Sequence, residues 1–93
     1  VKKAPKNNTS LEELSSESVN IYPNPSSGLF NLQSLSTLSS VMIVDVTGKE
    51  VYSDQNVGTG LYQMDLNHLS KGLYLIQIKN ISGNAITKQI VVR

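Results

Sequence analysis

The strongest strand signal in the chain is the stretch Leu73-Tyr74-Leu75-Ile76-Gln77-Ile78-Lys79. Tyr74, Ile76 and Ile78 occupy alternate positions, opposite Gln77 and Lys79. Because successive side chains of a β-strand point to opposite faces of its sheet, this alternation predicts a strand with one buried face.

Outward from this stretch, the chain consists of short apolar segments separated by Gly, Pro, Asn and Asp. Each segment is rich in Val, Ile, Tyr or Leu, and none has a helical period over three turns. Regularly spaced short strands with turn residues between them predict an all-β fold, an antiparallel β-sandwich of about seven strands. The segments expected to be strands are Val19–Tyr22, Leu29–Gln33, Val41–Val46, Lys49–Ser53, Leu61–Leu66, Leu73–Lys79 and Ala85–Val92.

Two of these segments depart from simple alternation. Val41 to Val44 is apolar at every position, which is typical of a central strand covered on both faces and leaves its orientation undecided. In the last segment Lys88 interrupts an otherwise apolar face, so we expect it at the margin of the sheet.

The turns between the segments have local causes. Pro23-Asn24-Pro25 cannot continue a paired strand, because two of its three residues lack an N–H group. Gly28 then gives the backbone freedom before the next strand. Thr47-Gly48 and Ser82-Gly83-Asn84 indicate tight hairpins.

Composition narrows the possible functions. The 93 residues form one domain at most, and the formal net charge of +1 comes from basic residues spread along the sequence. Strong attraction to nucleic acid or to acidic lipid is therefore not expected. The chain has no Cys, hence no disulfide or thiolate metal site, and no apolar run of transmembrane length. With His68 as the only His and no paired carboxylates, we expect no catalytic residue, metal site or cofactor.

The first 18 residues differ from the rest. They are rich in Lys, Glu, Ser and Asn, and Leu11 and Leu14 are their only sizeable apolar residues after Val1. Such a segment buries too little apolar surface to offset its ordering entropy. Residues 1–18 are therefore expected to be a flexible polar linker, and residues 19–93 the folded domain.

Four stretches together resemble one family. Their order and the position of the last one at the chain end match the type A C-terminal sorting domains of type IX secretion cargo. The stretches are Ile21-Tyr22-Pro23-Asn24-Pro25-Ser26-Ser27-Gly28-Leu29-Phe30, Ile43-Val44-Asp45-Val46-Thr47-Gly48-Lys49-Glu50-Val51, Leu69-Ser70-Lys71-Gly72-Leu73-Tyr74-Leu75-Ile76-Gln77-Ile78 and Lys88-Gln89-Ile90-Val91-Val92-Arg93. Val44 is a departure, since many relatives carry Tyr there.

The resemblance implies an immunoglobulin-like sandwich that is not an enzyme but a secretion signal. An outer-membrane translocon receptor would recognise it after the attached cargo has reached the periplasm, and a sortase-like peptidase would remove it by cutting the linker. The cargo would then be released or retained at the cell surface. The residues that carry the motifs, and hence the candidate recognition residues, are Tyr22, Pro23, Asn24, Pro25, Gly28, Asp45, Gly48, Gly72, Tyr74, Lys88 and Arg93.

Each motif also has a purely structural interpretation. Pro-Asn-Pro makes a stiff turn, Asp45 can accept hydrogen bonds from its own turn, and Tyr74 can lie in the core with its hydroxyl at a polar rim. Lys88 and Arg93 are either solvated cations or charges that a receptor reads. The alternative functions are a carbohydrate- or surface-binding module of a secreted enzyme, and a structural spacer. Absence of Trp and an aromatic share of 5% disfavour the binding module.

Overall fold

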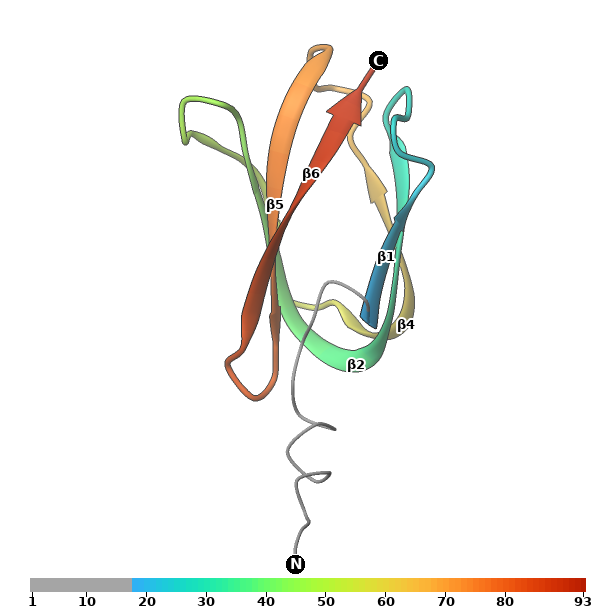
Figure 1. Ribbon diagram of the computed structural model, residues 1–93, viewed down its shortest axis with the longest axis vertical. Helices are drawn as coiled ribbons and strands as arrows, with labels where there is room; N and C mark the ends of the chain where they lie inside the picture. The colour runs from blue at the N-terminus through green and yellow to red at the C-terminus, as the bar shows by residue number, and fades with distance from the viewer. Residues whose placement is uncertain (1–17) are drawn as a thin grey trace, which may run out of the picture.

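The computed structural model describes residues 18–93, which form six β-strands (Figure 1). The expected linker over residues 1–18 lies outside the described residues except for Ser18. Between residues 18 and 93 no helix is long and apolar enough to cross a membrane. The strands are β1 (Val19–Tyr22), β2 (Leu29–Val44), β3 (Glu50–Asp54), β4 (Gly58–Asp65), β5 (Gly72–Asn80) and β6 (Ala85–Val92).

The sandwich is organised around β2, which has 16 residues and belongs to both layers. Its first half pairs with β1 and β4, and its second half pairs with β3 and β5. β6 extends the second layer by pairing with β5 along its whole length. All these pairings are antiparallel, so the expected all-β antiparallel sandwich is confirmed.

The number of strands is six rather than seven, because the segments expected at 29–33 and 41–46 form one continuous strand. Between them β2 bends from one layer to the other, as Figure 1 shows at the lower end of the molecule. The register of β2 shifts here against both β4 and β5, and Leu38 is buried at the bend. Strands that change layers do so at such irregularities. Residues 34–40 are rich in Ser and have the composition of a loop, yet they are part of strand β2.

One apolar core lies between the layers. It contains Phe30 and Leu32 from the first layer and Ile43, Ile76 and Ile90 from the second, all with no exposed surface. These side chains follow the alternation of buried and exposed positions along β2, β5 and β6. Each fully buried aliphatic or aromatic side chain stabilises the fold by about 1.5–3 kcal/mol relative to exposure.

The apolar stretch at Val41 to Val44 is central in its layer, between β3 and β5, as expected. The expectation that both of its faces are covered is wrong. Val41 and Ile43 point into the core, whereas Met42 and Val44 lie on the outer face and keep part of their surface exposed. Within the described residues no second layer covers that face.

Candidate functional site

The motif-bearing turns gather at one end of the sandwich. This end consists of residues 23–28, 45–49 and 66–71 together with Arg93, and we call it the motif end. The strand register brings these turns together. Leu29 pairs with Asp65 and Gly72 pairs with Val92, so the segments next to these residues lie at the same end of the sandwich. In Figure 1 it is the upper end, where the C-terminus lies. The bend of β2 and residues 81–84 are at the opposite end, which is also where β1 begins.

Asn24 joins the first motif to the last. Its side-chain Nδ2 donates a hydrogen bond to the carbonyl oxygen of Gln89 (3.0 Å), and its Oδ1 accepts one from the N–H of Val91 (3.1 Å). The side-chain amide thus supplies the donor and acceptor that a neighbouring strand would offer. The flanking bonds Tyr22–Pro23 and Asn24–Pro25 are both cis.

Ser26 continues this pairing along β6. Its N–H donates to Val91 O (3.0 Å), and its carbonyl oxygen accepts from Arg93 N (2.9 Å), which makes a parallel bridge. With the two bonds of Asn24, four hydrogen bonds cover the edge of β6 from Gln89 to Arg93. Exposed strand edges are sites of unwanted pairing, so this segment protects half of the β6 edge.

Gly28 is required by the backbone and by its surroundings. Its φ is +148°, and a Cβ atom there would lie 2.3 Å from Oδ1 and 2.8 Å from Cα of Asn67. The carbonyl oxygen of Gly28 accepts a hydrogen bond from Leu66 N (2.7 Å). The residue therefore holds the first motif against the turn that follows β4.

Asp45 organises the hairpin between β2 and β3, as the sequence indicated. Its Oδ1 accepts hydrogen bonds from Thr47 N (2.9 Å), Thr47 Oγ1 (2.6 Å) and Lys49 N (3.0 Å). The Thr47 hydroxyl, followed by the backbone N–H of Lys49, holds the pKa of the Asp45 carboxyl below its usual value of 3.8. Gly48 completes the turn with a φ of +90°.

Tyr74 closes the third motif. Its ring is buried in the core, and its hydroxyl donates to the carbonyl oxygen of Ser70 (2.7 Å). A strand tyrosine that bonds backbone a few residues upstream is the tyrosine corner of immunoglobulin-like sandwiches. The expectation of a core position with the hydroxyl at a polar rim is confirmed. Gly72 precedes it at the start of β5.

Three further candidate recognition residues, Tyr22, Arg93 and Lys88, make fewer contacts with the other motifs. Tyr22 is 42% exposed and donates a hydrogen bond to Gln33 Oε1 (3.3 Å). Arg93 is exposed at the motif end. Lys88 lies in the middle of β6 opposite Ile76, half-buried on the face that also carries Ile90, and is apart from the motif end.

A polar cluster that the sequence reasoning missed lies between β3 and β4. Tyr62 of β4 donates its hydroxyl to Asp54 Oδ2, and the hydroxyls of Tyr52 and Tyr62 are 2.6 Å apart. Since Tyr62 donates to Asp54, the hydroxyl of Tyr52 must be the donor to Tyr62. Burial, followed by the Asp54 carboxylate, raises the pKa of Tyr62, and the Tyr62 hydroxyl lowers that of Asp54. The cluster links β4 in the first layer to β3 in the second. The sequence did not predict it, because the alternation of residues within one strand does not show which side chains of another strand will meet them.

The described residues offer little to a metal ion or to acid–base chemistry. Between residues 18 and 93 no group of three or more His, Cys, Asp or Glu side chains could hold a metal ion. A phenol with a raised pKa is a poor general base, and the carboxylates of Asp45 and Asp54 already accept hydrogen bonds from their neighbours. The polar side chains at the motif end close turns and the edge of β6.

Fold and turns together define a small antiparallel β-sandwich whose first and last motifs are hydrogen-bonded to each other. Residues 20–93 match the family model described as "Secretion system C-terminal sorting domain". The chain belongs to this family of type IX secretion sorting domains. The family resemblance drawn from the sequence is thereby confirmed.

The chain is similar to parts of other known proteins, among them the following two. An endo-acting ulvan lyase from Formosa agariphila is 30% identical over 77 residues, which are 81% of this chain and 15% of that protein. The chain therefore spans only a small part of this relative. The crystal structure of CopC from Methylosinus trichosporium OB3b is 17% identical, and the match covers 80% of this chain and 92% of that one with a TM-score of 0.47. This overlap is too loose to bear on function.

Proposed function

We propose that residues 19–93 are a C-terminal sorting signal that directs an attached cargo protein across the outer membrane through the type IX secretion system. The observation that carries the proposal is the meeting of the family motifs at one end of a single fold, with Asn24 bonded to β6. The match to the family over residues 20–93 supports it.

The cargo precedes the domain in the same polypeptide. An enzyme is a fitting class of cargo, because the matched region is only 15% of the endo-acting ulvan lyase that contains it. The path runs through the periplasm to a receptor of the translocon, and a sortase-like peptidase cuts within residues 1–18. The domain itself serves as an address rather than as a catalyst, and the exported cargo ends at the cell surface or in the medium.

The binding-module alternative lacks a supporting observation. Modules that bind sugars usually present several exposed aromatic rings on one face. Among the described tyrosines only Tyr22 is largely exposed, whereas Tyr74 lies in the core and Tyr52 and Tyr62 hydrogen-bond to each other. This distribution favours the sorting role.

The test is a reporter protein with a general secretory signal, fused before Val1 and expressed in a strain with a working type IX translocon. We expect the reporter in the medium or on the surface when residues 19–93 are present, and in the periplasm when they are deleted. Equal export with and without residues 19–93 would refute the sorting function. A strain lacking the translocon is the control for leakage.

A further inference from the structure

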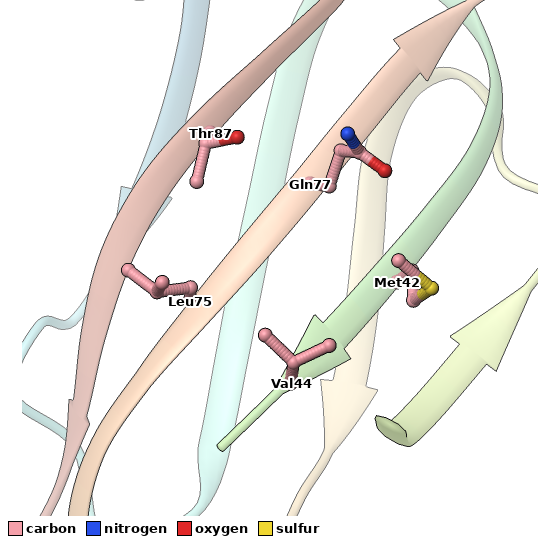
Figure 2. Close-up of a pocket in the computed structure, with 5 residues that line it drawn as sticks. All are labelled: Met42, Val44, Leu75, Gln77 and Thr87. Carbon is pink, nitrogen blue, oxygen red and sulfur yellow. The ribbon is translucent and has the colours of Figure 1, made fainter. Parts of the chain in front are cut away.

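The outer face of the second layer carries an apolar patch beside the motif end. The patch consists of Met42 and Val44 on β2, Leu73 and Leu75 on β5, and Val91 on β6. Four of these side chains are half-buried, and Leu73 is 41% exposed. Figure 2 shows Met42, Val44 and Leu75 together with Gln77 and Thr87 around an open depression on this face.

The register shows that the patch is continuous. Val44 pairs with Leu75, and Leu73 pairs with Val91, so these side chains form adjacent rows across three neighbouring strands. Apolar residues on both faces of a central strand are typical of sheets that are covered on both sides. Here the inner face of β2 packs on the core, whereas its outer face is exposed to solvent. An apolar outer face of this kind is typical of a surface that binds another protein.

Charge around the patch indicates the chemistry of that partner. Lys49, Lys71 and Arg93 are exposed at the motif end, beyond the rows of the patch. β5 and β6 contain no acidic residue, and the carboxylate of Asp45 is occupied by its own turn. Glu50, which pairs with Val44, is an exposed acid on the β3 side of the patch. Asp65 is also exposed next to the motif end, where its carboxylate accepts hydrogen bonds from Asn67. A protein surface with an apolar centre flanked by carboxylates complements this arrangement.

The described chain enters the domain at the end remote from the patch. β1 begins at the opposite end, where Val19 pairs with Ser34 beside the bend of β2. The polypeptide upstream of Ser18 therefore joins the domain at the end remote from the motif end.

We propose that the apolar patch and the three cations at its border are the surface that the export receptor recognises, through an apolar protein segment flanked by acidic residues. This inference rests on the proposed sorting function and names the part of the domain that performs it. Within the motifs, the side chains of Asn24, Asp45 and Tyr74 build the scaffold, because they are engaged in internal contacts. The exposed side chains of the same motifs are the ones that are read.

The test uses the reporter fusion with single charge substitutions. Leu73→Glu places a carboxylate in the patch, and Lys71→Glu reverses a cation at its border. The matched controls are Leu35→Glu, at an apolar side chain that is 87% exposed beside the bend of β2, and Lys79→Glu, at the other end of β5 on the same face. Thermal unfolding of each purified 93-residue chain checks that the substitution leaves the fold intact, and only folded variants enter the comparison.

We expect Leu73→Glu and Lys71→Glu to lower the exported fraction by about tenfold or more, and the two controls to remain within about twofold of the unsubstituted fusion. Undiminished export of both patch variants overturns the inference while leaving the sorting function standing. Equal losses in patch variants and controls also overturn it. Failure of the unsubstituted fusion to be exported removes the sorting function and this inference with it.

A second copy of the chain is the competing occupant of the patch. Sedimentation of the purified chain is expected to show a monomer at micromolar concentration. A dimer that Leu73→Glu dissociates, with export unchanged, would assign the patch to self-association and overturn the proposal.

Discussion

Asn24 and Val91 are 67 positions apart in the sequence, yet the N–H of Val91 donates a hydrogen bond of 3.1 Å to the side-chain Oδ1 of Asn24. This contact places the Pro-Asn-Pro turn on the edge of the last strand. The first and last family motifs are therefore parts of one structure, and damage to either one affects both.

Asn24→Ala removes both side-chain hydrogen bonds to β6. We expect the free energy of unfolding to fall by about 1–2 kcal/mol, because each net hydrogen bond contributes roughly 1 kcal/mol and water replaces part of the loss at an exposed site. Urea unfolding measures this change, and hydrogen exchange of the Val91 amide should accelerate. Asn56→Ala, at an exposed turn asparagine, is the control and should have little effect. An unchanged Val91 exchange rate would contradict the assigned role of Asn24.

Gly28→Ala should be among the most damaging alanine substitutions at a glycine. The new Cβ atom would meet Oδ1 and Cα of Asn67 at 2.3 Å and 2.8 Å while φ is +148°. Backbone strain and overpacking together are expected to cost roughly 2–5 kcal/mol. Gly48→Ala is the matched control, because its φ is +90° but no atom lies within 4 Å of the added Cβ. Equal unfolding midpoints for the two variants would argue against the close contact with Asn67.

The hairpin carboxylate makes stability depend on pH. Because hydrogen bonds depress the pKa of Asp45, its contribution is present above the unfolded value of 3.8 and is lost as pH falls through the lower folded pKa. Carbon-detected NMR titration should give a midpoint below 3.8 for Asp45. Asp45→Asn should keep the hairpin and lose this part of the acid dependence, because Asn80 accepts hydrogen bonds from Ser82 N and Asn84 N in the corresponding turn. A midpoint at or above 3.8 would contradict the turn's role.

Tyr62→Phe breaks the link between β4 and β3. It leaves Asp54 and Tyr52 without the hydroxyl that they share, so we expect a loss of about 1–2 kcal/mol in urea unfolding. Tyr52→Phe removes only one hydrogen bond and should cost less. In the unsubstituted protein the raised pKa of Tyr62 means that its stabilisation is present below about 10.0 and is lost as pH rises further. A Tyr52→Phe loss larger than that of Tyr62→Phe would contradict the central position of the Tyr62 hydroxyl in the cluster.

Most strand positions could be predicted from the sequence because their causes are local. The alternation of Tyr74, Ile76 and Ile78 specifies both a strand and its buried face, since side-chain period and burial coincide. The Asp45 turn is equally local, because its donors lie two and four residues away. Residues 34–40 were missed as a strand because Ser and Thr in this number are typical of loops, and only the partners on both sides hold them extended.

The candidate site was likewise predictable only where its causes are local in the sequence. By itself the sequence determined the motifs, their order, the turns that contain them and the family. Tertiary structure decided that Asn24 bonds to β6, that Lys88 lies apart from the motif end, and that Met42 and Val44 face solvent. The physical reason is that turn geometry and alternation depend on neighbouring residues. Edge pairing and the covering of a sheet face depend on which distant segments meet, and an apolar residue carries the same sequence signal whether its partner is its own core or another protein.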